Sequence, residues 1–257
     1  MILAVDIGNS NIVIGCFDGN EILFIERLST NQQCTALEYV ISIKTILEIN
    51  SIKIEHIEGC IISSVVPSVT QTLKAALERL TNTEVMTVGP GIKTGLKIML
   101  ENPAQLGSDR VADAVAGINL YPMPLIIIDM GTATTVSVID RDKNYLGGMI
   151  IPGLRVSLDS LTMRTSQLPK IGLEAPKRVI GSNTVECMKS GIIYYSAAGI
   201  DGVTQRIEES LGEKCTIVST GGLANKIIPH CKREIIIDEQ LLLKGLMIIY
   251  NKNKNKK

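Results

Sequence analysis

The stretch Val5-Asp6-Ile7-Gly8-Asn9-Ser10-Asn11 decides how we interpret the rest of the chain. An apolar run, Ile2 to Val5, leads into it and a second run, Ile12 to Ile14, follows, which predicts a buried strand, a tight polar turn and a paired strand. Gly8 lets the backbone approach a ligand, and the small polar side chains after it suit phosphate oxygens. Asp6, at the strand end, could hold the water shell of a magnesium ion. The alternative is an ordinary hairpin turn.

The same pattern recurs 123 residues further along the chain, where Ile128-Asp129-Met130-Gly131-Thr132 aligns with the first stretch. Apolar runs again stand on both sides, Pro124 to Ile128 before it and Ala133 to Ile139 after it. A repeat with so long a period indicates two similar domains rather than a solenoid, whose units are much shorter. We therefore expect one domain over residues 1–118 and a second over 119–257. Two such loops facing each other across a cleft would bind a nucleotide from both sides.

Composition excludes several classes of protein. A hydrophobic content of 45% against 20% charged residues excludes general disorder. Lysine plus arginine equal aspartate plus glutamate at 26 each, so no overall field favours nucleic acid or an anionic membrane. No apolar run approaches the roughly 18 residues that span a bilayer, and the N-terminus enters a strand directly. The six cysteines show no CxxC spacing and indicate buried thiols in a reducing compartment. We expect a cytoplasmic protein.

Helices and strands alternate after the opening meander. Apolar periodicity predicts helices over Cys34–Ile49, Ser68–Leu80, Val111–Leu120, Leu154–Met163, Asn183–Leu211 and Gln240–Tyr250, with strands over Ile57–Val65, Thr83–Val88, Cys215–Ser219 and Ile235–Asp238. This order predicts a mixed α/β fold with helices covering partly parallel sheets. Glycines inside the long helix predict either a kink or close helix packing, as at a subunit interface. The Thr220-Gly221-Gly222 turn suits either the base of a nucleotide or a simple passage from strand to helix.

A polar segment, Glu101 to Arg110, stands just before the alanine-rich helix. Ser108 or Asp109 could cap that helix, which is the structural interpretation. In the functional interpretation, Asp109 accepts a hydrogen bond from a substrate hydroxyl and Arg110 meets an anionic group. Positioning of this kind contributes most of the effect in phosphoryl transfer.

Four motifs occur in the order typical of type III pantothenate kinases, which the chain resembles over nearly its whole length. They are Asp6-Ile7-Gly8-Asn9-Ser10-Asn11, Glu101-Asn102-Pro103 followed by Gly107-Ser108-Asp109-Arg110, Asp129-Met130-Gly131-Thr132-Ala133, and Gly147-Gly148-Met149-Ile150-Ile151-Pro152-Gly153. The resemblance implies the actin, sugar kinase and heat-shock ATPase superfamily, with two ribonuclease H-like domains. It also implies ATP-dependent phosphorylation of pantothenate to 4'-phosphopantothenate, the first step of coenzyme A biosynthesis. The implied assembly is a homodimer that needs Mg²⁺ with ATP and a monovalent cation, K⁺ or NH4⁺.

The resemblance also implies roles for single residues. Asp109 would be the general base on the pantothenate hydroxyl, Asp129 would ligate the monovalent cation, and Asp6 would hold magnesium through water. The implied ATP contacts are Asp6, Ile7, Gly8, Asn9, Ser10, Asn11, Ile12, Val13 and Thr132. The implied substrate contacts are Gly107, Ser108, Asp109, Arg110 and Thr184. Thr184 can also be interpreted as a helix cap. Leu100 stands where family members often carry a tyrosine near the substrate, which affects one pantothenate contact.

Three alternatives differ from this interpretation. One is a phosphatase that hydrolyses nucleotide or polyphosphate ends, with water as the acceptor and no need for pantothenate. A kinase for another small hydroxylated substrate would share the phosphate loops, so only substrate profiling separates it. A non-catalytic regulatory or binding relative would be expected to have lost at least one of Asp6, Asp109 and Asp129, and all three are present. The sequence holds neither a Walker A lysine loop nor a GxGxxG motif, which disfavours the commoner nucleotide-binding folds.

Overall fold

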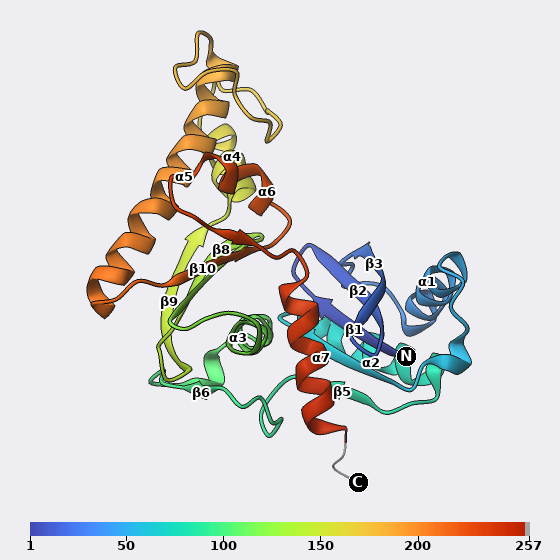
Figure 1. Cartoon of the computed structure of the whole chain (residues 1–257). Helices are drawn as coiled ribbons and strands as arrows, with labels where there is room; N and C mark the ends of the chain where they lie inside the picture. Colours follow the sequence, from blue (N-terminus) through green and yellow to red (C-terminus); the bar gives the residue numbers. More distant parts are fainter. Residues whose placement is uncertain (255–257) are drawn as a thin grey trace. The chain divides into compact units, whose positions relative to one another are not determined.

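The computed structural model describes residues 1–254, which divide into two compact units (Figure 1). The first unit comprises Met1–Gly95, Asn102–Ala116 and the chain from Leu241 onward, and the second comprises Leu96–Glu101 and Gly117–Gln240. Unlike the predicted stretches 1–118 and 119–257, neither unit is continuous. The C-terminal helix packs with the first unit, and a short segment before residue 102 packs with the second. The domain boundary at residue 118 stays a prediction.

The first unit is built on a five-stranded sheet in the order β3-β2-β1-β4-β5. Its strands are β1 (Ile2–Ile7), β2 (Asn11–Asp18), β3 (Glu21–Ser29), β4 (Gly59–Ser64) and β5 (Val85–Thr87). The first three form the predicted antiparallel meander, and β4 and β5 add in parallel beside β1. The helices assigned wholly or mainly to this unit are α1 (Ala36–Ile49), η1 (Ile54–His56), α2 (Pro67–Thr81), η2 (Pro103–Gln105), α3 (Ser108–Leu120) and α7 (Leu241–Asn253).

Helices cover both faces of this sheet, which explains why β1 reads as a continuous apolar run. The core on one face joins strand residues such as Leu3 and Val5 to residues of α1 and α2. On the other face α7 packs against β1 and β4 (Figure 1). There Gly59 leaves the space that the Tyr250 ring occupies, since a Cβ at residue 59 would overlap that ring.

The second unit repeats this plan. Its strands are β6 (Lys97–Ile98), β7 (Leu125–Met130), β8 (Ala133–Ile139), β9 (Asn144–Pro152), β10 (Thr216–Thr220) and β11 (Ile236–Ile237). They lie in the order β11-β10-β7-β8-β9-β6, in which β6 adds one parallel edge strand. The other strands repeat the order of the first sheet: β9, β8, β7, β10 and β11 take the places of β3, β2, β1, β4 and β5. The helices are α4 (Leu154–Met163), α5 (Thr184–Leu211), α6 (Ala224–Ile227) and η3 (Ile228–His230). The predicted α/β class with two mixed sheets and flanking helices is confirmed.

Two local expectations need correction. Helix α3 begins at Ser108 rather than Val111, so the polar residues before the alanine-rich stretch form its first turn. Helix α5 is one continuous helix as predicted, and a Cβ at Gly191 or Gly199 would meet nothing within 4 Å in this chain. Cys187 is exposed rather than buried. In the part of the chain that the structure describes, no helix is long and apolar enough to cross a membrane.

Candidate active site

The turn between β1 and β2 is fixed by backbone hydrogen bonds and by one threonine. The Gly8 amide donates to the Asn11 carbonyl at 3.0 Å, which closes the turn. The Thr30 hydroxyl donates to the Gly8 carbonyl at 2.6 Å, and the Thr30 amide donates to the Ser10 carbonyl at 3.1 Å. These bonds satisfy the carbonyls with protein partners, while the side chains of residues 9–11 stay exposed. The turn therefore presents amides and small polar groups, as a phosphate-binding loop requires.

Two serines close the strand beside this turn. Asp6 pairs with Ser63, and Ile7 with Ser64, in the parallel register of β1 and β4. Paired residues of adjacent strands point to the same face, so Asp6 and Ser63 share one face at the carboxyl edge of the sheet. The Ser108 hydroxyl reaches this edge: it donates to the Ser64 carbonyl at 2.9 Å and accepts from the Ser64 amide at 2.9 Å. It also lies 3.1 Å from the Ser63 hydroxyl.

The first turn of α3 carries the predicted base. The Val111 amide donates to the Gly107 carbonyl at 3.0 Å, so Gly107 precedes the first turn and neither Ser108 nor Asp109 is the N-cap. The Asp109 carboxylate accepts from the Arg110 amide at 2.7 Å. A Cβ at Gly107 would overlap the same carboxylate oxygen, so glycine is what allows Asp109 to fold back over the turn. The first unit thus places the carboxylates of Asp6 and Asp109 on segments that meet at one sheet edge.

The second loop, between β7 and β8, is held by close backbone packing. Asp129 is the last residue but one of β7 and lies in register with Thr220 of β10. A Cβ at Gly221, whose φ is +88°, would overlap an Asp129 carboxylate oxygen and lie 2.7 Å from the Met130 backbone. A Cβ at Gly153 would overlap the Thr132 carbonyl. Only glycine fits at these two positions, so the turn after β7 lies directly against two other segments of the chain.

The remaining predicted residues lie elsewhere in the second unit. Thr184 is the first residue of α5 and is exposed. Asn183 is the cap of this helix, because its side chain accepts from the Glu186 amide at 3.0 Å, so the interpretation of Thr184 as a cap is wrong. Leu100 is half-buried and approaches Gly147, where a Cβ would lie 3.4 Å from its side chain.

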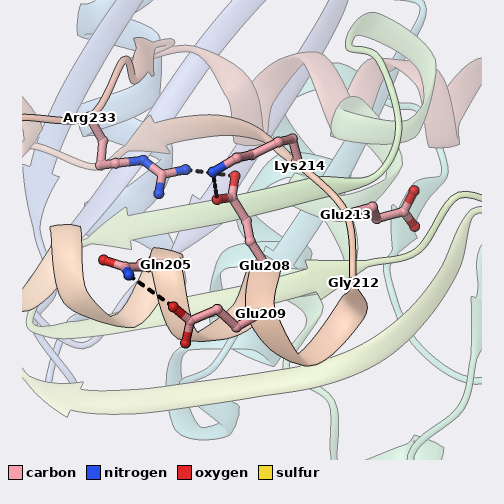
Figure 2. A pocket seen from close by; sticks show the side chains of 7 residues that line it. All are labelled: Gln205, Glu208, Glu209, Gly212, Glu213, Lys214 and Arg233. Atoms are coloured by element: carbon pink, nitrogen blue, oxygen red, sulfur yellow. Dashed lines mark hydrogen bonds and ion pairs between the residues drawn. The ribbon is translucent and has the colours of Figure 1, made fainter.

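A hollow of about 480 Å³ lies in the second unit and is lined by none of the predicted site residues. In Figure 2, Glu208 of α5 lies between Lys214 and Arg233, with N–O distances of 2.8 and 2.6 Å. Burial alone would raise the pKa of Glu208, but hydrogen bonds from Arg233, Lys214 and the Cys215 amide outweigh it and lower the pKa to about 2. The polar lining of the hollow is therefore explained by this ion network. The network connects the end of α5 to the segment that leads into β10.

Comparison with known proteins decides the family. A sequence model of type III pantothenate kinases matches residues 2–206. A type III pantothenate kinase from Exiguobacterium sp. (strain ATCC BAA-1283 / AT1b) is 44% identical over 253 residues, which cover 98% of this chain and 99% of that protein. The chain belongs to the type III pantothenate kinase family. It is a phosphotransferase that phosphorylates pantothenate with ATP in coenzyme A biosynthesis.

Solved structures show how widely this kinase fold is shared. A Baf family protein from Campylobacter jejuni is 20% identical with a TM-score of 0.60, and the match covers 98% of this kinase and 99% of that chain. Component A of (R)-2-hydroxyglutaryl-CoA dehydratase from Acidaminococcus fermentans is 16% identical with a TM-score of 0.58 and covers 100% and 99%. At such low identity these likenesses show the fold alone.

Sequence reasoning missed several residues that support the two loops of this kinase. Ser63 and Ser64 had a local signal, because a polar pair ended an apolar strand just before Pro67. Thr30 had none, since its contact with Gly8 depends on the register between β2 and β3. The support that Gly221 gives to Asp129 depends on the parallel pairing of two strands far apart in sequence.

Proposed function

We propose that Asp109 is the general base of the pantothenate kinase reaction and that the two loops bind ATP. The observation that carries the proposal is the contact of Ser108 with the end of β4, which brings the first turn of α3 to the sheet edge where Asp6 lies. Asp6, Asp109 and Asp129 are each partly exposed, so each carboxylate can meet a ligand. A carboxylate has room for about four hydrogen bonds, so the bond from Arg110 leaves Asp109 able to accept another.

The reaction then needs one proton transfer and one displacement. Asp109 accepts the proton of the primary hydroxyl of pantothenate as that oxygen attacks the γ-phosphorus of ATP. The new bond joins the hydroxyl oxygen to phosphorus, the bond from the γ-phosphorus to the β–γ bridging oxygen breaks, and ADP leaves with that electron pair. Most of the acceleration comes from orientation of the two reactants. Arg110 and the positive end of α3 suit the carboxylate of pantothenate, and Thr184 supplies a further hydroxyl.

The first loop offers ATP both backbone amides and short polar side chains. Asn9, Ser10 and Asn11 are exposed, while Ile7 and Ile12 are fully buried and anchor the turn on either side. Buried anchors keep the amides in place, so little ordering is needed when phosphate binds. In the second loop, Thr132 is exposed and provides the corresponding hydroxyl.

The residues present also fit the two expected cations. Within residues 1–254 no cluster of three or more histidine, cysteine or acidic side chains could hold a metal by itself. Mg²⁺ does not require one, because it keeps several waters and takes one or two carboxylates plus substrate phosphates, as Asp6 beside a phosphate loop provides. K⁺ or NH4⁺ would lie against the Asp129 carboxylate, which is partly exposed. When bound, these cations neutralise charge on the phosphates.

Two properties of the whole protein belong to the same proposal. We expect a homodimer, because the second unit exposes large apolar side chains on neighbouring elements: Ile150 at 71%, Met163 at 80%, Ile180 at 85% and Tyr195 at 82%. Large exposed apolar side chains of this kind are common where two proteins meet. We also expect a cytoplasmic enzyme. All six cysteines are free thiols, as is usual in a reducing compartment that supplies ATP.

The first experiment measures ADP release by the purified protein with ATP and Mg²⁺, with and without pantothenate, in sodium and then in potassium or ammonium buffer. ADP release should require pantothenate and K⁺ or NH4⁺. Asp109→Asn should lower kcat about 10³-fold, as expected when a general base is lost. Asp18→Asn, in an exposed turn of the same unit, is the matched control and should leave kcat unchanged. An Asp109→Asn variant that binds both substrates and keeps the wild-type rate would show that another group is the base. Equal rates in sodium and in potassium or ammonium buffer would contradict the proposed requirement for K⁺ or NH4⁺.

The dimer is tested separately by sedimentation velocity. Tyr195→Glu or Ile180→Glu should shift the protein toward monomer, because burying an unpaired charge in an interface costs free energy. The control is Leu37→Glu, since Leu37 is also exposed, at 52%, but lies on α1 of the first unit. A monomeric wild-type protein, or dimers unaffected by the first two changes, would contradict the proposed interface.

A further inference from the structure

The Ser108 hydroxyl has no hydrogen-bonding capacity left for a substrate. A serine hydroxyl donates one hydrogen bond and accepts two. Here it donates to the Ser64 carbonyl, accepts from the Ser64 amide, and has the Ser63 hydroxyl as its third partner, which then acts as donor. Ser108 was expected to line the substrate site, yet its side chain is fully engaged by β4. The Ser108 side chain therefore binds β4 and does not bind pantothenate.

Ser108 holds the first turn of α3, which is packed less tightly than the rest of the helix. From Val111 to Ile118 the helix is buried, and Gly245 of α7 lies so close to Ala112 that a Cβ there would overlap its carbonyl. The first turn is only partly buried, and the Ser108 hydroxyl bonds it to the end of β4. The residue that follows Ser108 is the proposed base, Asp109.

The other end of the contact leads to the phosphate loop. Ser63 is fully buried and pairs with Asp6 across about 4.8 Å of parallel sheet. Ser64 in turn accepts from the Thr70 hydroxyl at 2.7 Å and from the Val66 amide at 3.0 Å, so the end of β4 is itself fixed. A short connected path thus runs from Asp6 through Ser63 and Ser108 to Asp109.

We propose that Ser108, bonded to Ser63 and Ser64, is a positioning residue that holds Asp109 at the reacting distance from the phosphate loop. The inference rests on the proposed role of Asp109 as base. Without the hydroxyl, the first turn of α3 loses these bonds to β4, and Asp109 samples positions from which proton transfer is slow. A displacement of about 1 Å at a reacting group can cost 10²-fold in rate, and partial loosening should cost less.

The test is a double-mutant cycle on kcat with Ser108→Ala and Asp109→Asn. Ser108→Ala should lower kcat about 10-fold and leave KM for ATP within twofold. In the Asp109→Asn background the same change should have almost no further effect, because its influence is exerted through that carboxylate. The matched control is Thr81→Val, which removes a buried hydroxyl bonded to the Leu77 carbonyl at the opposite edge of the same sheet. It should lower stability but not kcat.

The possible results separate the two proposals. Equal losses of kcat with Ser108→Ala in the wild-type and Asp109→Asn backgrounds would overturn the positioning role. So would a Ser108→Ala variant with the wild-type kcat, or one in which KM for pantothenate rises as much as kcat falls. A wild-type rate for Asp109→Asn would instead overturn the base assignment. A loss of kcat with Ser108→Ala in that case would show that the serine positions a different group.

Discussion

The turns after β1 and after β7 occupy equivalent places in two sheets of the same strand order, yet they are held in different ways. The first turn is held by added hydrogen bonds, above all from Thr30 to Gly8. The second turn has a backbone bond of its own, from the Gly131 amide to the Ala133 carbonyl at 3.1 Å, but glycines at positions 153 and 221 also let two segments lie directly against its backbone. The two sheets therefore share a strand order, while the segments packed around their turns differ. The first turn should tolerate change, and the second should not.

The largest expected effect comes from adding one methyl group beside the second turn. Gly153 has φ of −68° and ψ of 162°, which alanine adopts easily, so Gly153→Ala tests crowding alone. Its Cβ would lie 2.8 Å from the Gly131 carbonyl and closer still to that of Thr132. We expect a loss of about 3 kcal/mol in the free energy of unfolding, at the upper end for overpacking, and at least a 100-fold fall in kcat/KM for ATP.

The matched change in the first turn is Gly8→Ala, whose Cβ would meet only the Asn11 carbonyl at 3.2 Å. Its stability should stay within about 1 kcal/mol of the wild type. Thermal unfolding and ATP kinetics of the two variants measure the contrast directly. Equal destabilisation by both changes would refute the difference between the turns.

The two units should also differ in their response to acid. In the second unit Glu208 is 5% exposed and has a pKa of about 2, below its ordinary value of 4.5. The folded state therefore binds this proton less readily than the unfolded state, so the stabilisation is complete above about pH 4.5 and is lost as the pH falls toward 2. Glu208→Gln should cost about 2 kcal/mol at neutral pH, and less in acid.

The control for this change lies in the first unit, where Glu78 of α2 forms a surface pair with Lys74 at 3.8 Å. Glu78→Gln should cost less than about 0.5 kcal/mol at any pH, as is usual for exposed pairs. Chemical unfolding of the wild type and both variants at pH 7, 5 and 3 measures the comparison. A gap between wild type and Glu208→Gln that does not shrink in acid would contradict the assigned pKa.

The smallest effect is expected where a single hydroxyl supports the first turn. Thr30→Val removes the bond to the Gly8 carbonyl and keeps the shape, which should raise KM for ATP about 5-fold and cost about 1 kcal/mol of stability. Thr45→Val removes a hydroxyl bond to the Ile41 carbonyl on an exposed part of α1 and should change neither. A KM for ATP that Thr30→Val leaves unchanged would mean that the turn is rigid without this bond.

Local patterns in the sequence were sufficient for the sheets and for the two turns. Strand β7 coincides with β1 shifted by the predicted 123 residues, and α4 has the predicted bounds. Such features follow from short apolar runs and from the turn residues between them. The family and its reaction followed from motifs in a fixed order, and the comparisons confirm both.

Features that depend on distant contacts could not be predicted in this way. The start of α3 was placed too late because Ser108, Asp109 and Arg110 hide the apolar period of the helix. The partners of Ser108 lie more than 40 residues away, on β4, and become visible only when the helix is packed on the sheet. The assignment of α7 to the first unit has the same origin, because nothing in the apolar sequence of a helix says which sheet it covers.

That assignment of α7 has a consequence for the order in which the protein is made. Strand β1 precedes the second sheet in the chain, whereas α7, the helix that covers the second face of β1, follows that sheet. Proteins generally fold domain by domain as they emerge from the ribosome. One apolar face of the first sheet therefore stays uncovered during synthesis until the second sheet has been translated and α7 has emerged. Until then that face is exposed to aggregation or to capture by chaperones.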